Sequence, residues 1–256
     1  MKAFSIMKNI FKVLCFSLLL VSTQAFAIIN VESMRVQKKS DGFSGELELD
    51  SDLLSGNTDS KHVSFGNRLQ WDYGNKTNFI ITSYSYGESS GVRDVNKGYI
   101  HLRHIEHMNQ KWAWESFGQM EQNEFTRLNY RGLIGGGVRQ TLHQDDDKSG
   151  IYLGLGGFYS TETLDDNTMT NLVRGNIYLV IKHKLNDTNR FMSTTYYQPA
   201  IDGPDNFRAL EQLTYEIAIN KKLNLSISLD VSHNSQPPAG VQLTDTGFHT
   251  GIKYNF

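Results

Sequence analysis

Three histidines in the stretch HLRHIEH are the first candidates for chemistry, because imidazole nitrogens bind transition metals. His101, His104 and His107 follow one another at intervals of three residues. On a helix this spacing would place all three on one face, but on a strand His104 points away from the other two. The alternation of the surrounding residues predicts a strand, so we expect no metal site here.

A second candidate is the run Ser232, His233, Asn234, whose residue types resemble those of an outer-membrane phospholipase. Adjacent strand positions cannot bring a hydroxyl group against its own general base, as a catalytic triad requires. An outer-membrane hydrolase is therefore an alternative that the sequence does not support.

Glycine-rich and acidic stretches complete the inventory. GLIGGGVRQ and GLGGFYS are not followed by a helix, which a dinucleotide-binding fingerprint would need. The acidic turns HQDDDKSG and LDDN are typical of solvated loops. We expect no catalytic residue, no cofactor and no bound metal, and hence a protein that is not an enzyme.

The elements that position these side chains follow a period of two. In LNLSISLDV, residues 223–231, every odd-numbered residue is apolar and every even-numbered residue is polar. The same alternation recurs around 46–50, 63–71, 127–142, 173–182 and 212–219, with turn-forming residues between the runs. We predict about 12 strands, within a range of about 10 to 14, each of about ten residues.

The N-terminus has the pattern of a cleaved secretory signal over residues 1–27. Three lysines precede the short apolar run VLCFSLLLV, and the small residues of AFA follow it. Met1 and Met7 are equally suitable as the first residue of the translated chain. Cleavage after Ala27 would remove Cys15, the only cysteine, and would leave residues 28–41 as a short polar lead-in on the periplasmic side.

Charge argues against nucleic acid as a partner. The whole chain has 25 basic and 27 acidic residues, and the predicted signal holds three lysines and no acid, leaving 22 against 27 and a net charge of −5. A nucleic-acid-binding protein would be basic. No linker divides the chain, so one domain is expected over residues 42–256.

Two architectures share this alternation. In a soluble sandwich the polar face meets water, whereas in a membrane barrel the apolar face meets lipid and the polar face lines the lumen. Predicted export, long strands and aromatic residues near strand ends, such as Trp112 with Trp114, favour an all-β, closed antiparallel transmembrane β-barrel. A secreted or periplasmic β-sandwich that binds a ligand is the alternative.

Three stretches, LDSDLLSGNTDS, RGLIGGGVRQTL and SHNSQPPAGVQLTDTGFHTGIKYNF, resemble the YdiY-like family of salt-induced outer-membrane proteins, which carries a domain of unknown function. The resemblance implies a Gram-negative outer membrane, with its lipid as the surroundings. It also implies that the barrel-assembly machinery reads the closing strand, through Gly251, Ile252, Tyr254 and Phe256. It supplies no catalytic residue and no substrate.

The charges expected to face the lumen indicate the function. Both signs are present, so they predict either a paired network that fills the lumen or a narrow wet path. We expect a narrow passive pore or an envelope-integrity barrel related to stress. A non-conducting structural barrel is the alternative, and the sequence indicates no oligomeric state. The expected lumen charges are Glu46, Glu48, Arg103, Glu115, Arg127, Arg131, Arg174, Lys182, Glu216 and Asp230.

Overall fold

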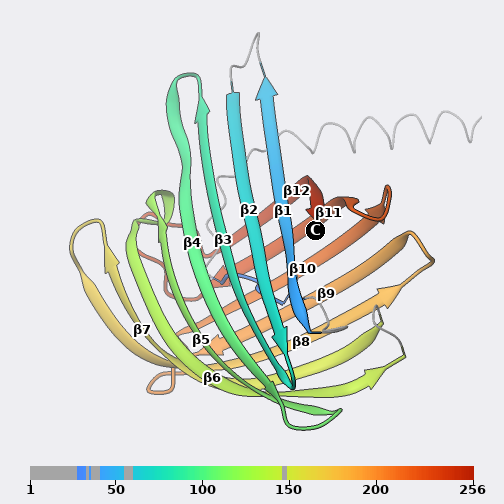
Figure 1. The fold of residues 1–256 in the computed structure, drawn as a ribbon. Helices are drawn as coiled ribbons and strands as arrows, with labels where there is room; N and C mark the ends of the chain where they lie inside the picture. Colours follow the sequence, from blue (N-terminus) through green and yellow to red (C-terminus); the bar gives the residue numbers. More distant parts are fainter. Residues whose placement is uncertain (1–27, 33–34, 36–40, 55–59, 146–148) are drawn as a thin grey trace, which may run out of the picture.

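The alternating runs form twelve strands, and each strand pairs antiparallel with the next one in the sequence until β12 returns to β1 (Figure 1). The structure is a computed structural model that describes residues 28–32, 35, 41–54, 60–145 and 149–256, so the predicted signal at 1–27 lies outside the described residues. The strands are β1 (Gly42–Leu54), β2 (Ser60–Tyr73), β3 (Lys76–Ser89), β4 (Val92–His107), β5 (Trp112–Asn123), β6 (Leu128–Gln144), β7 (Gly150–Leu164), β8 (Met169–Lys184), β9 (Asn189–Pro199), β10 (Phe207–Ala218), β11 (Leu223–Asn234) and β12 (Thr244–Asn255).

The predicted fold class is confirmed as a closed antiparallel barrel of twelve strands. The strands are longer than the predicted ten residues, from 11 in β9 to 17 in β6. Within the described part of the chain, no helix is long and apolar enough to cross a membrane. We call the end of the barrel where β1 begins and β12 ends the terminal rim, and the opposite end the far rim.

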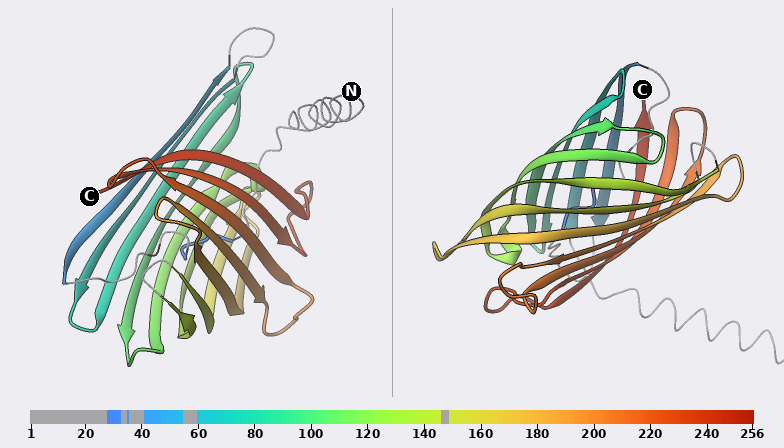
Figure 2. Two further views of the ribbon diagram at one scale, coloured as in Figure 1. Left: turned by 90° about the vertical axis from the view of Figure 1, so that its right-hand side faces the viewer. Right: turned by 90° about the horizontal axis from the view of Figure 1, so that it is seen from below.

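The seam between β1 and β12 closes the barrel through a short ladder. Four residue pairs join the strands, from Glu46 opposite Asn255 to Leu49 opposite Ile252. Gly45 and Phe256 add two backbone hydrogen bonds of 3.0 Å at the terminal rim. Beyond Leu49 the two strands diverge towards the far rim, as the two views in Figure 2 show.

The barrel has the reverse polarity of a water-soluble protein. On β11, the outward-facing Leu229 and Val231 are exposed, whereas the inward-facing Asp230 and Ser232 are almost completely buried. The same pattern on β12 exposes Ile252 and buries Lys253. An apolar outer wall around a charged interior is the arrangement of a barrel that spans a lipid bilayer.

One strand departs from the predicted phase. A short 3-10 helix, η2 (Glu124–Thr126), ends β5, and Arg127 follows it in the left-handed conformation with a φ of 60°. A β-bulge between Leu128 and Tyr130 then shifts the register, so Leu128 faces inward and is buried. The prediction of Arg127 in the lumen was wrong, because the period of two begins only after this bulge.

Glycines let β6 and β7 approach closely. A Cβ on Gly156 would lie 2.3 Å from the carbonyl oxygen of Gly136, and one on Gly137 would lie 2.5 Å from that of Leu155. Real Cβ atoms do not approach backbone oxygens so closely. The glycine-rich stretches therefore serve the packing of the barrel wall, where a strand must bend sharply.

We predict that Gly156→Ala destabilises the barrel by about 1–3 kcal/mol, because the added methyl group meets backbone atoms that cannot rotate away. Gly203→Ala is the matched control, since a Cβ there has no neighbour within 4 Å. Urea titration of both variants in detergent micelles measures the change. Equal midpoints for the two variants would contradict the assignment.

Candidate functional site

Residues 28–32 and 35, which precede β1 and which we call the segment, lie inside the barrel. Ile28, Val31, Glu32 and Arg35 are 5%, 2%, 0% and 8% exposed, values typical of a protein core. The prediction of a polar lead-in outside the barrel was therefore wrong for the described part of 28–41. The reason is that its apolar residues find buried partners and its charged residues find buried countercharges.

Two apolar clusters hold this segment against different parts of the wall. Ile28 packs with Tyr178 and Tyr196 in a cluster from β7 to β10. Val31 packs with Phe79 and Ile105 in a cluster from β3 to β5. Each buried aliphatic side chain contributes about 1.5–3 kcal/mol, and the segment thereby bridges two parts of the barrel wall.

A buried ion cluster fixes the charged part of the segment. The Glu32 carboxylate lies 2.8 Å from Arg103, 3.3 Å from Arg139 and 3.3 Å from Arg35. Glu115 of β5 pairs with Arg35 and lies 3.1 Å from Arg103.

Three further hydrogen-bond donors complete the cluster. The Tyr178 hydroxyl donates to Glu115 at 2.9 Å. The Lys182 ammonium donates to the backbone oxygen of Arg35 at 3.0 Å. The Asn30 amide donates to Gln212 of β10 at 2.6 Å, so polar contacts also reach the opposite wall.

The electrostatics favour an ionised Glu32. Burial opposes the charged form, but the guanidinium groups of Arg139, Arg35 and Arg103 outweigh it and lower the pKa of Glu32 from 4.5 to about 2. The carboxylate therefore stays charged at neutral pH and keeps three cations paired.

Little space remains beside the segment. A void of about 30 Å³ lies between it and the wall, lined by Ile29, His101 and Arg103. That volume is close to the space of a single water molecule. The segment therefore leaves room for about one water molecule on this side, whereas Ile28, Ile29 and Asn30 line a larger cavity on another side.

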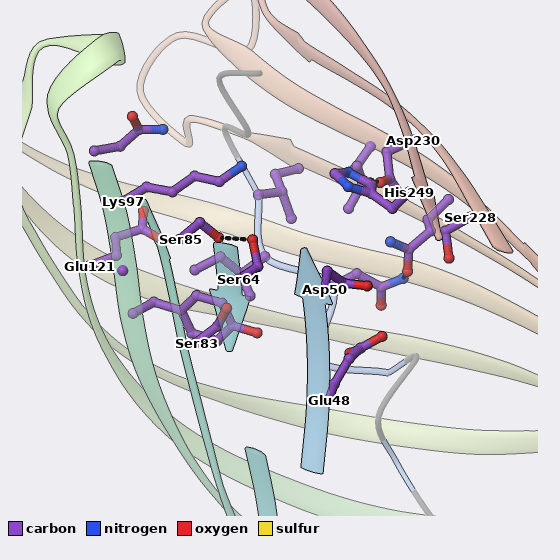
Figure 3. Close-up of a pocket in the computed structure, with 18 of the residues that line it drawn as sticks. Glu48, Asp50, Ser64, Ser83, Ser85, Lys97, Glu121, Ser228, Asp230 and His249 are labelled. Atoms are coloured by element: carbon purple, nitrogen blue, oxygen red, sulfur yellow. Dashed lines mark hydrogen bonds and ion pairs between the residues drawn. The ribbon is translucent and has the colours of Figure 1, made fainter. Parts of the chain in front are cut away.

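Two larger cavities flank the filled region. One of about 230 Å³ lies near the seam, with Lys97 on one wall and Asp230, His249 and Asp50 on the other (Figure 3). Another of about 350 Å³ opens between the walls and the turns of the far rim. We call this second cavity the far-rim vestibule.

The structure places nine of the ten predicted lumen charges on inward-facing positions, and Arg127 at the far rim instead. Arg127 pairs there with Asp165 at 2.8 Å and with Asp166 at 3.1 Å. Several inward charges join different strands, such as Lys253 of β12, 3.2 Å from Glu216 of β10 and 3.8 Å from Glu48 of β1. The inward nine are Glu46, Glu48, Arg103, Glu115, Arg131, Arg174, Lys182, Glu216 and Asp230.

The remaining predicted positions also have definite places. Ile252, Tyr254 and Phe256 are exposed on the outer wall, while Gly251 faces inward against the Asp50 carboxylate. His101 faces inward and bonds to Gln119, but His104 faces outward and bonds to Asn78. In the described residues, no group of three or more His, Cys, Asp or Glu side chains could hold a metal ion.

Sequence reasoning missed the residues that fill the lumen. Glu32 and Arg35 belong to a stretch without a clear period, and their interleaving with Ile28, Ile29 and Val31 was the available signal. Glu162 and Arg208 were missed as well, although the alternation of their strands places them inward. Their ion pair of 2.7 Å depends on the barrel, because 46 residues separate them in the sequence.

Comparison with known proteins adds a family. The sequence model of a family described as "Protein of unknown function, DUF481" matches residues 48–256. The match covers almost all of the barrel and confirms the YdiY-like resemblance at the level of the family. No curated protein matches the chain.

Several solved structures are similar in outline. A NanC porin has a TM-score of 0.49 at 8% identity, with 83% of this chain and 98% of that chain covered. A KdgM porin has a TM-score of 0.47 at 11% identity, with 84% and 99% covered. The translocator domain of autotransporter NalP from Neisseria meningitidis has a TM-score of 0.47 at 10% identity, with 88% and 92% covered.

We predict that Glu32→Gln loosens the segment inside the barrel. Breaking a buried ion pair costs about 3–5 kcal/mol, so hydrogen-exchange protection of residues 28–35 should fall at least about 100-fold. Glu124→Gln is the control, because Glu124 forms an exposed pair with Arg93 at the far rim and such pairs contribute little. Protection within twofold of wild type for Glu32→Gln would show that Glu32 does not hold the segment.

Acid should loosen the segment too. The pKa of Glu32 is lowered in the folded protein, so its stabilisation is complete above pH 4.5 and is lost as pH falls towards 2. Protection factors of residues 28–35, corrected for intrinsic exchange, should drop about tenfold per pH unit in this window. Glu32→Gln should lack this component, and a wild-type protection factor that is flat from pH 5 to pH 2.5 would contradict the prediction.

Proposed function

The chain belongs to the DUF481 family, whose function is unknown, and we propose that it is a narrow outer-membrane pore held closed by the segment made of residues 28–32 and 35. The observation that carries the proposal is the burial of this segment across the lumen. A purely structural barrel could fill its interior with side chains of its own wall. Here a separate stretch of chain, joined to the wall by side-chain contacts, occupies the path.

The contacts of the segment suit a gate. It is held by two apolar clusters and by one ion cluster that centres on Glu32. Displacing it would leave Arg103 and Arg139 facing a water-filled path, where charged groups are solvated and tolerated. The closed state is therefore stable, and the open state needs no new fold.

The outer wall supports a location in the outer membrane. The exposed apolar band, including Ile134, Val173 and Phe248, suits membrane lipid. A secretory signal at residues 1–27 would bring the chain to the outer membrane, and the barrel-assembly machinery would insert it there. We assign no catalytic role to any residue.

The envelope-integrity role is the second candidate. The paired interior that fills the lumen, with Glu48, Glu216 and Lys253 joining β1, β10 and β12, favours a rigid barrel. In that case the segment would be a permanent part of the core.

Planar-bilayer conductance of the refolded protein distinguishes the two roles. Glu32→Lys places an ammonium group among Arg35, Arg103 and Arg139, and like-charge repulsion should expel the segment. We expect rare or no openings for wild type and frequent step-like openings for Glu32→Lys. Glu124→Lys, which changes the same charge at the far rim, should behave as wild type.

Hydrogen exchange of residues 28–35 accompanies each recording. A Glu32→Lys variant whose segment is released but which does not conduct would support the structural barrel and overturn the pore. A wild type that conducts freely while its segment is protected would show that the segment does not close the path.

A further inference from the structure

The far-rim vestibule is a built cavity with a defined wall. It measures about 350 Å³ and lies between β6, β7 and β8 on one side and the turn from Ser235 to Leu243 on the other. Gln236, Pro237 and Val241 of this turn line it. Arg127 holds the turn in place by donating to the backbone oxygen of Ala239 at 3.0 Å.

Three buried arginines form the inner wall of the vestibule. Arg131, Arg174 and Arg208 all line the cavity and are 7%, 2% and 5% exposed. Glu162 lies between two of them, 2.9 Å from Arg131 and 2.7 Å from Arg208. Glu121 pairs with Arg131 as well, so Arg131 has two carboxylate partners and Arg208 has one.

Arg174 lacks such a partner. Its guanidinium donates to the backbone oxygens of Gln198 and Asn206 at 3.2 and 3.1 Å and to the Asn206 side chain at 2.8 Å. Among the described residues, no carboxylate lies within ion-pair distance of it. The charged groups that act on it most strongly are Arg208, Glu162 and Arg131, which are two cations and one anion.

The arginine hydrogen-bond donors that are left without an acceptor indicate a ligand of negative charge. A buried cation without a countercharge is costly, and proteins rarely keep one without a reason. The Nε atoms of Arg174 and Arg208 are buried and have no hydrogen-bond acceptor in the described part of the chain. Guanidinium groups bind carboxylate and phosphate oxygens in a preferred planar geometry.

We propose that the far-rim vestibule binds an oxyanion, a carboxylate or phosphate group on a small polar solute, with Arg174 as its principal contact. The size of the cavity suits a solute about as large as a sugar acid or a sugar phosphate. Asp245 of β12 also lines the vestibule and would face the uncharged part of such a solute. The inference does not depend on gating, because the site lies on the far-rim side of the segment.

The experiment compares probes that differ in one charged group. Isothermal titration of the detergent-solubilised full barrel uses glucuronate, glucose 6-phosphate and glucose, at low and high salt. We expect both anions to bind at least tenfold more tightly than glucose, and added salt to weaken them. Equal affinity of all three probes would overturn the proposal.

Variants then locate the site. Arg174→Gln should weaken binding of both anions at least tenfold, whereas Arg93→Gln, an exposed arginine at the same rim, should bind as wild type. Arg174 also holds the turn between β9 and β10, so folding of each variant is checked by the heat-modifiable gel shift. Arg174→Lys keeps the positive charge. If Arg174 contacts the anion, Arg174→Lys should bind both anions more tightly than Arg174→Gln does. If Arg174 only holds the turn, the two variants should bind the anions equally. Anion binding that is the same in Arg174→Gln and Arg93→Gln would place the site elsewhere and overturn the assignment.

Discussion

The interior of this barrel depends on one constraint, that charges facing a narrow lumen must find partners there. The outer wall is largely apolar, so most charged residues of the twelve strands point inward, into a space that admits little water. Unpaired charges in such a space cost several kcal/mol each. The arrangement of the lumen largely meets this requirement. Both proposals, the closed pore and the anion-binding vestibule, depend on which charges are paired.

The requirement is met differently at two levels of the barrel. Where Arg103 and Arg139 line the wall, the countercharge comes from Glu32, which belongs to no strand. The segment is thus held because the wall needs its carboxylate. Near the far rim, Glu121 and Glu162 neutralise Arg131 and Arg208 but leave Arg174 without a carboxylate. The need for countercharges therefore accounts for the segment that occupies the lumen at one level and for the vestibule proposed to bind an anion at the other.

The wall supplies the rigidity that makes these pairings specific. Consecutive strands are joined by long ladders, and glycines in β6 and β7 allow a close approach that no side chain would permit. The seam is the exception, since four residue pairs close it. Lys253 reinforces that seam from inside by its contacts to Glu48 and Glu216. Charge pairing and backbone pairing thus support one another where the backbone ladder is shortest.

Alternation along the chain was enough to predict the fold class, a barrel of about 12 strands and most inward positions, because a period of two assigns each side chain to a face without any knowledge of its neighbours. That local rule placed Arg103, Glu115 and Arg174 inward. It failed at Arg127, where a 3-10 turn and a bulge restart the period. The burial of residues 28–32 and 35 in the lumen could not be predicted from the sequence, and neither could the lack of a carboxylate beside Arg174 among the described residues. Both depend on contacts between residues far apart in the chain, such as Arg35 with Glu115, and no local pattern encodes them.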